Sequence, residues 1–123
     1  MSKLLIVDDE IDIREFAKKF FAKRGIDVFT ASGGVEALKI IDENQPDLVL
    51  LDIQMEEING IEVLKKLREA QNNIKVIMVT GAEDPKRINE ANSLGVRGYV
   101  HKPLVLEELE KIVLEELSVK PGD

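Results

Sequence analysis

The sequence predicts an open α/β fold, a doubly wound parallel sheet of five strands in the order 2-1-3-4-5 with five helices. Short apolar runs alternate with segments of helical periodicity along all 123 residues, a repetition typical of a parallel sheet covered by helices. The runs are continuous rather than alternately apolar and polar, so both faces of the sheet should be buried. We expect one domain over residues 1–119 and a frayed tail at 120–123.

The five strands are predicted where aliphatic and β-branched residues cluster. They cover residues 3–7, 27–31, 48–51, 75–80 and 98–101. The first helix follows the first strand and ends at Lys23, Arg24 and Gly25, since cations followed by glycine are typical of a helix C-terminus. Its apolar face repeats at i, i+3, i+4, i+7 and i+8. The residues on that face are Ile13, Phe16, Ala17, Phe20 and Phe21.

Four further helices follow from the same periodicity. The second should begin at Ser32 as N-cap and end before Pro46, and the fourth should begin at Asp84 and Pro85 and end near Gly95. Apolar residues at helical spacing line the second and third helices, namely Val35, Leu38, Ile41, Ile61, Leu64 and Leu67. The last helix carries Leu106, Leu109, Ile112 and Val113 at the same spacing.

Composition excludes several classes of function. Lys and Arg number 17 against 24 Asp and Glu, a net charge of -7, so the chain offers no basic field for nucleic acid or for an anionic membrane. Cysteine is absent, which rules out disulfides, thiolate metal sites and a cysteine nucleophile. The apolar runs are too short to cross a bilayer and no signal peptide is present, so we expect a cytoplasmic protein.

Polar residues stand where the predicted strands end. Asp8 and Asp9 follow the first strand, Asp52 follows the third, Thr80 ends the fourth and Lys102 follows the fifth. Ligands of open parallel sheets bind beyond the carboxyl ends of the strands, and the order 2-1-3-4-5 makes the first and third strands neighbours. The three acids should therefore converge there.

Such a cluster of acids needs compensation. Two carboxylates about 4 Å apart repel by about 1 kcal/mol in water and up to about 4 kcal/mol in a partly desolvated cleft. Either one acid is protonated or a hard divalent cation binds, and oxygen ligands favour Mg²⁺; Lys102 offsets part of the charge. Asp8 or Asp9 could instead serve only as a helix N-cap, but a cap does not require the acid, hydroxyl and amine on the other strand ends.

Taken in order, these residues resemble the receiver domain of two-component response regulators over essentially the whole chain. The resemblance rests on four short motifs. The first is residues 7–10, and the second is Asp52 followed by Met55 and Asn59-Gly60. The third is Thr80-Gly81, and the fourth runs from Tyr99 to Lys102-Pro103.

The resemblance implies a flavodoxin-like fold in which Asp52 takes phosphate from a phosphohistidine on a sensor histidine kinase or phosphotransfer protein. It implies that Asp9 and Asp52 ligate Mg²⁺ directly with the backbone carbonyl of Gln54, and that Asp8 acts mainly through water. The domain would not be an enzyme beyond its own phosphotransfer and autodephosphorylation. Lys102 and Thr80 would stabilise the transferring phosphoryl group together with the metal, which agrees with the chemistry of aspartyl phosphates.

The resemblance further implies a switch and a cis Lys102–Pro103 peptide bond. Thr80 would move toward the phosphoryl group and Tyr99 would swing inward, changing the surface that a downstream protein target binds. No output domain follows the last helix in this sequence, so we expect signalling through a partner's surface. His101, the single histidine, is expected to be an ordinary, partly exposed side chain.

The sequence departs from the family pattern at Glu56, where proline is common, and adds a second acid at Glu57. Loss of the proline should loosen this loop, and the extra charge should slow an anionic phosphodonor.

Three other functions were weighed against the receiver domain. A haloacid dehalogenase-type phosphohydrolase would carry its nucleophile after the first strand. A flavodoxin-like mononucleotide binder would not place two acids in its phosphate loop. A receiver that acts as a phosphorylation-independent docking module is the remaining alternative.

Overall fold

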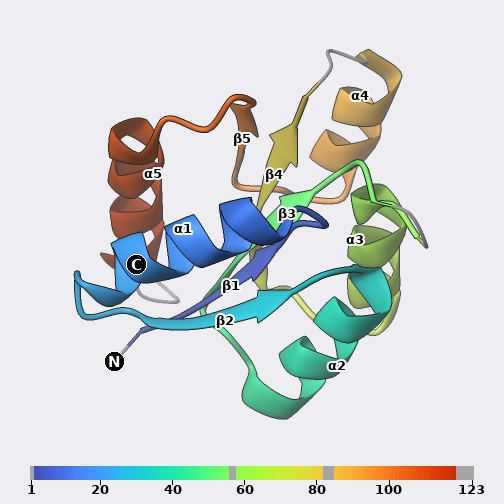
Figure 1. Cartoon of the computed structure of the whole chain (residues 1–123). Coiled ribbons are helices and arrows are strands. Elements are labelled where there is room, and N and C mark those ends of the chain that lie inside the picture. The colour runs from blue at the N-terminus through green and yellow to red at the C-terminus, as the bar shows by residue number, and fades with distance from the viewer. Residues whose placement is uncertain (1, 56–57, 82–84, 119–123) are drawn as a thin grey trace.

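A computed structural model describes residues 2–55, 58–81 and 85–118, and Figure 1 shows how its elements are arranged. Within those residues, five strands form one parallel sheet in the order β2-β1-β3-β4-β5. The strands are β1 (Lys3–Val7), β2 (Asp27–Ala31), β3 (Leu48–Asp52), β4 (Lys75–Thr80) and β5 (Gly98–His101). The helices are α1 (Ile11–Ala22), α2 (Gly34–Asn44), α3 (Gly60–Glu69), α4 (Pro85–Ser93) and α5 (Leu106–Ser118). The predicted fold and strand order are confirmed.

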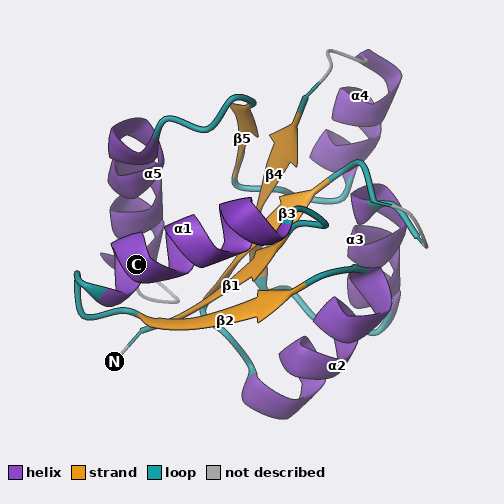
Figure 2. Cartoon of the chain, viewed as in Figure 1, coloured by secondary structure: helices purple, strands orange, loops and turns teal. Residues whose placement is uncertain are grey.

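The helices cover both faces of the sheet, as Figure 2 shows. Helices α1 and α5 pack on one face through Phe21, Leu109 and their neighbours, and α2, α3 and α4 pack on the other. Strands β1, β3 and β4 are buried over nearly their whole length, because each lies between two other strands and under helices on both sides. This burial explains why their sequences are continuous apolar runs.

The ends of the elements hold most of the differences from prediction. The N-cap of α2 is Gly33 rather than Ser32, because the Ser32 hydroxyl and backbone N–H are turned to the carboxylate of Glu36. Gly25 follows the last turn of α1 with φ at 79° and Gly95 follows α4 with φ at 78°, the left-handed conformation that favours glycine after a helix. The predicted cap Asp84, the acids Glu56 and Glu57, and the tail at 120–123 lie outside the described residues.

No helix in the described part of the chain is both long enough and apolar enough to span a bilayer.

Candidate functional site

The carboxyl edge of the sheet gathers the predicted residues. Asp52 is the last residue of β3, Asp8 follows β1, Thr80 ends β4 and Lys102 follows β5. Asp8, Asp52 and Thr80 are only 2%, 1% and 3% exposed, and they are the buried polar side chains among the described residues. Burying a carboxylate is costly unless it is paired with a cation. These buried acids therefore require a positively charged partner at this edge.

Lys102 provides the pairing cation. Its Nζ lies 2.9 Å from Oδ2 of Asp52 and 3.4 Å from Oδ2 of Asp8, with Oε1 of Glu10 at 3.9 Å. The backbone N–H of Lys102 donates to the carbonyl of Thr80, which ties the segment after β5 to the end of β4. The predicted cis Lys102–Pro103 bond is confirmed. One ammonium therefore bridges two buried carboxylates from neighbouring strands.

The surroundings raise the pKa of both Asp52 and Lys102, for different reasons. Burial raises the pKa of Asp52 above its ordinary value, and the hydrogen bond and charge of Lys102 only partly oppose that rise. Burial by itself would lower the pKa of Lys102, but the hydrogen bond that its Nζ donates to Asp52 and the charges of Asp52 and Asp8 raise it. Lys102 thus stays cationic, while the Asp52 carboxylate is held at a cost in free energy.

A local hydrogen bond also orients the Asp52 carboxylate. Its Oδ1 accepts from the backbone N–H of Gln54 at 3.0 Å, while Oδ2 accepts from Lys102 at 2.9 Å. The first residue of α3, Gly60, packs directly on this strand end, since a Cβ there would lie 2.4 Å from the carbonyl oxygen of Asp52. Both carboxylate oxygens therefore have a fixed direction.

The cluster of carboxylates after β1 includes Glu10, a residue that the predicted set of metal ligands left out, and it does not include Asp52. Asp8, Asp9 and Glu10 can each offer one carboxylate oxygen, all within 4.8 Å of one another. Asp9 and Glu10 are exposed whereas Asp8 is buried, and Asp8 Oδ1 accepts from the backbone N–H of Glu10 at 2.9 Å. The run of three acids was the available signal for Glu10. The N-cap of α1 is Glu10, with no side-chain cap hydrogen bond, so neither aspartate is a simple helix cap.

Thr80 and Tyr99 share one face of the sheet. Tyr99 is in register with Met78, and Thr80 lies two residues beyond Met78 on β4, so alternation puts Thr80 and Tyr99 on the same side of adjacent strands. The half-buried Tyr99 donates its hydroxyl to the carbonyl of Ile88 in α4 at 2.8 Å, and burial raises the pKa of this phenol. His101 is exposed.

An open doubly wound sheet with a buried aspartate on β3, an acid cluster after β1 and a lysine after β5 is the arrangement that the sequence predicted for a signalling receiver domain. A family model for the response regulator receiver domain matches residues 4–114, and the chain belongs to this family.

Similar proteins agree with this assignment. The chain is 37% identical to sporulation initiation phosphotransferase F of Bacillus subtilis over 96% of its own length and 95% of that protein. It is 36% identical to regulatory protein AtoC of Escherichia coli over 98% of its length but only 26% of that protein. Among solved structures, a CheY-like receiver domain protein from Methanospirillum hungatei has a TM-score of 0.90 at 29% identity, covering 95% of this chain and 94% of that one. The Francisella response regulator 1452 receiver domain has a TM-score of 0.88 at 32% identity, covering 95% and 97%.

Proposed function

We propose that this receiver domain takes a phosphoryl group onto Asp52 from a phosphohistidine on a sensor histidine kinase or phosphotransfer protein. The observation that carries the proposal is the bridge from Lys102 Nζ to Asp52 at 2.9 Å and to Asp8 at 3.4 Å, between two carboxylates that are almost fully buried. Two buried carboxylates that share one cation carry an uncompensated negative charge, which is costly unless a further cation binds. Such an arrangement suits a site that binds a hard metal ion and a phosphoryl group.

The chain's donor set fits Mg²⁺. The acids at this edge offer only hard oxygen ligands, and one lysine leaves the buried pair with an uncompensated negative charge. Asp9, Asp52 and the backbone carbonyl of Gln54 would hold the ion directly, with Asp8 acting through water. When bound, Mg²⁺ supplies neutralisation of charge on the phosphoryl oxygens.

The chain's own residues would then carry out the transfer. An oxygen of the Asp52 carboxylate attacks phosphorus, the phosphorus–nitrogen bond to the donor histidine breaks, and the electron pair of that bond stays on the imidazole. Lys102 pairs with one phosphoryl oxygen and the Thr80 hydroxyl donates to another. Beyond this transfer and the later hydrolysis of its own aspartyl phosphate, we propose no enzymatic activity.

An exposed apolar surface beside the site supports docking of the phosphodonor. A groove of about 320 Å³ runs between α1 and the segment after β5, lined by Ile13, Phe16, Pro103 and Leu106 together with Lys102. Phe16 is 67% exposed, and together with the apolar lining of the groove it forms a contiguous apolar surface of the kind that marks protein interaction sites. An apolar face of a partner seated here would bring its histidine to the edge that holds Asp52. We place this exchange, and the contact with a downstream protein target, in the cytoplasm.

Phosphorylation by acetyl phosphate with Mg²⁺, followed by intact-mass measurement, tests the site. Wild type should gain one phosphoryl group, Asp52→Asn should gain none, and chelation of Mg²⁺ should abolish the adduct. Phe16→Ala should be phosphorylated normally by acetyl phosphate but more slowly by a phosphohistidine donor. An adduct that persists on Asp52→Asn would overturn the assignment of the phosphoacceptor. No adduct on wild type would favour the phosphorylation-independent docking module.

A further inference from the structure

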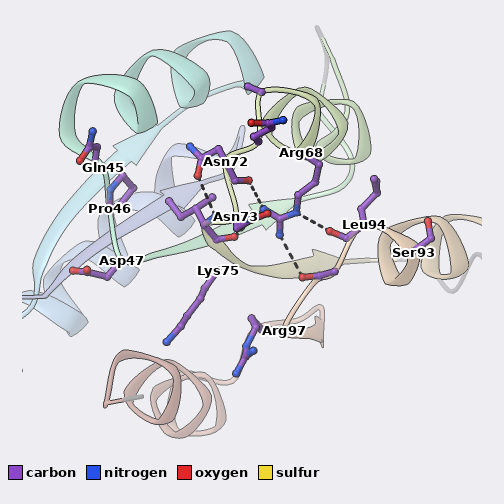
Figure 3. A pocket seen from close by; sticks show the side chains of 14 residues that line it. Gln45, Pro46, Asp47, Arg68, Asn72, Asn73, Lys75, Ser93, Leu94 and Arg97 are labelled. Atoms are coloured by element: carbon purple, nitrogen blue, oxygen red, sulfur yellow. Dashed lines mark hydrogen bonds between the residues drawn. The ribbon is translucent and has the colours of Figure 1, made fainter. Parts of the chain in front are cut away.

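Arginine side chains hold backbone carbonyls at both edges of the sheet. At the edge away from Asp52 lies a polar groove of about 1080 Å³, which Figure 3 shows from close by. There the guanidinium of Arg68 donates to four backbone carbonyls, those of Asn72, Ile74, Leu94 and Gly95. Arg97 of the same groove pairs with Glu116, so both arginines are engaged within the fold. At the Asp52 edge, Arg14 of α1 makes a contact of the same kind beside the cluster of acids.

Arg14 binds the turn between β1 and α1 on both sides of Asp9. Its Nη1 donates to the carbonyl of Asp8 at 2.7 Å, and its backbone N–H donates to the carbonyl of Glu10 at 3.2 Å. The second contact is the ordinary first hydrogen bond of a helix whose N-cap is Glu10. The first is made by a side chain that reaches back over the turn. Together they fix the carbonyls of the residues before and after Asp9.

The direction of the Asp9 side chain depends on this turn. Asp8 is held at every polar group, because its backbone N–H donates to Ala31 and its carboxylate binds the Glu10 N–H and Lys102. Asp9 is exposed, and within the described residues no hydrogen bond or ion pair holds its carboxylate. The backbone on either side of Asp9 is therefore what orients it.

Neither the helix nor an ion pair accounts for a cation at this position. Arg14 is the fourth residue of α1, near the end where the helix dipole disfavours positive charge. Acids stand close in the sequence, at 9, 10, 12 and 15, yet Arg14 forms no ion pair with the part of the chain that the structure describes. Its half-buried guanidinium donates to a neutral carbonyl instead. Its hydrogen bond to the turn is therefore the contact that distinguishes Arg14.

We propose that Arg14 is a positioning residue for the metal site, which holds the turn at residues 8–10 so that the Asp9 carboxylate is ready to ligate Mg²⁺. Groups that orient a metal ligand commonly change metal affinity by about 10-fold to 100-fold when they are removed. A cation that acted only through its charge would do the opposite, since its removal would favour Mg²⁺. The role toward the metal rests on the function proposed above. The hold on the turn does not.

The order of the turn is measured without metal or phosphate. In Arg14→Met, backbone order parameters of Asp9 and Glu10 from ¹⁵N relaxation should fall from about 0.85 toward about 0.6, values typical of rigid and of flexible backbone. Lys18→Met is the matched control, because it removes an exposed cation of the same helix that has no hydrogen bond or ion pair among the described residues. Its order parameters should equal those of wild type. Arg14→Lys keeps the charge without the guanidinium and should be intermediate, and it serves if the methionine variant fails to fold.

Calorimetric titration with Mg²⁺ separates positioning from charge. Arg14→Met should bind Mg²⁺ about tenfold more weakly than wild type. Lys18→Met reports the effect of charge by itself, and it should bind as tightly as wild type or slightly more tightly. With acetyl phosphate, the Mg²⁺ concentration for half-maximal phosphorylation should rise about tenfold in Arg14→Met, whereas the rate at saturating Mg²⁺ should change far less.

Order parameters that stay unchanged in both Arg14 variants would overturn the proposal. So would an equal fall in Mg²⁺ affinity and in the rate at saturating Mg²⁺, since Arg14 would then support the site as a whole. If wild type binds Mg²⁺ and Arg14→Met binds it equally or more tightly, this inference alone fails. If wild type itself binds no Mg²⁺, the metal site of the proposed function fails, and the role of Arg14 toward the metal fails with it.

Discussion

The Nζ of Lys102 lies 2.9 Å from Asp52 Oδ2 and 3.4 Å from Asp8 Oδ2, so one cation serves two carboxylates at the end of β1 and β3. Both carboxylates are buried, and the exposed acids Asp9 and Glu10 stand beside them. The free site consequently carries an excess of negative charge in a region that water screens poorly. Its stability, its pH dependence and its affinity for cations should all reflect that excess.

Removing the Asp52 charge should stabilise the fold. Burial raises the pKa of Asp52 in the folded protein above the unfolded value of 3.8, so the folded state binds this proton more tightly than the unfolded state does. The resulting stabilisation is present at low pH and is lost as pH rises from the unfolded pKa through the folded pKa. At pH 7 we expect Asp52→Asn to exceed wild type in free energy of unfolding by on the order of 1 kcal/mol.

Urea unfolding of both proteins at several pH values measures this difference. The advantage of Asp52→Asn should be largest near neutral pH and should shrink as pH falls toward 3.8. Asp42→Asn, a change of an exposed aspartate in α2, is the control and should show no such trend. A neutral-pH advantage that is absent, or that grows on acidification, would contradict the electrostatic account.

Replacing Lys102 should separate metal binding from phosphotransfer. In Lys102→Met the ammonium no longer competes for Asp8 and Asp52, so Mg²⁺ should bind more tightly by calorimetry. Phosphorylation by acetyl phosphate at saturating Mg²⁺ should nevertheless slow by about tenfold or more, because a charged donor to the transferring phosphoryl group is gone. Lys18→Met, on the exposed side of α1, is the control. If the affinity for Mg²⁺ and the rate of phosphorylation both fall in Lys102→Met, Lys102 acts only by maintaining the structure of the site.

Gly60 should be intolerant of any side chain. A Cβ would lie 2.4 Å from the Asp52 carbonyl oxygen, and backbone cannot yield as a flexible side chain does. The overlap should outweigh the better helix propensity of alanine, so Gly60→Ala should lose about 1 to 3 kcal/mol of stability. Gly98→Ala is the matched control, since nothing lies within 4 Å of its added Cβ, and thermal unfolding of the pair gives the comparison. Equal stability of the two variants would show that α3 shifts freely from β3.

Much of the fold was predictable because each level of the sequence agrees with the others. Continuous apolar strands require a sheet buried on both faces, and the order that follows brings Asp8 next to Asp52. The strand-end rule then selects Thr80 and Lys102 without knowledge of side-chain geometry. The strand boundaries were also predictable from the local sequence, except that β3 extends one residue further than predicted and includes Asp52.

The remaining features depend on contacts between side chains and distant backbone, which no local pattern encodes. Arg68 occupies a position in α3 that resembles any polar helix residue, yet its partners lie in two other connections. The bond from Tyr99 to Ile88 is of the same kind. Glu10 was recognisable as an acid, but its approach to Asp9 and Asp8 depends on how the chain turns after β1.

The last prediction concerns the coupling between Thr80 and Tyr99. A phosphoryl group on Asp52 can shift an equilibrium only by its differential interaction with the two states, and about 5.5 kcal/mol takes a ratio from 1:99 to 99:1. One charge-assisted hydrogen bond supplies about 1.5 to 3 kcal/mol, so Thr80 should account for part of the shift, with Lys102 and the metal supplying the rest. The Tyr99 hydroxyl donates a hydrogen bond to the backbone carbonyl of Ile88 in α4. Inward motion of the ring must therefore also change this hydrogen bond to α4.

We therefore expect Thr80→Ala to be phosphorylated at Asp52 but to show a smaller phosphate-induced change in partner affinity and in the Tyr99 ring resonances. Thr80→Ser retains the hydroxyl and should behave like wild type, which separates the hydrogen bond from the packing of the threonine methyl group. Tyr99→Phe should lose about 1 kcal/mol of stability through the missing bond to Ile88 even without phosphate. If Thr80→Ala leaves both the affinity change and the Tyr99 spectrum intact, the signal leaves Asp52 by a route that does not pass through these two side chains.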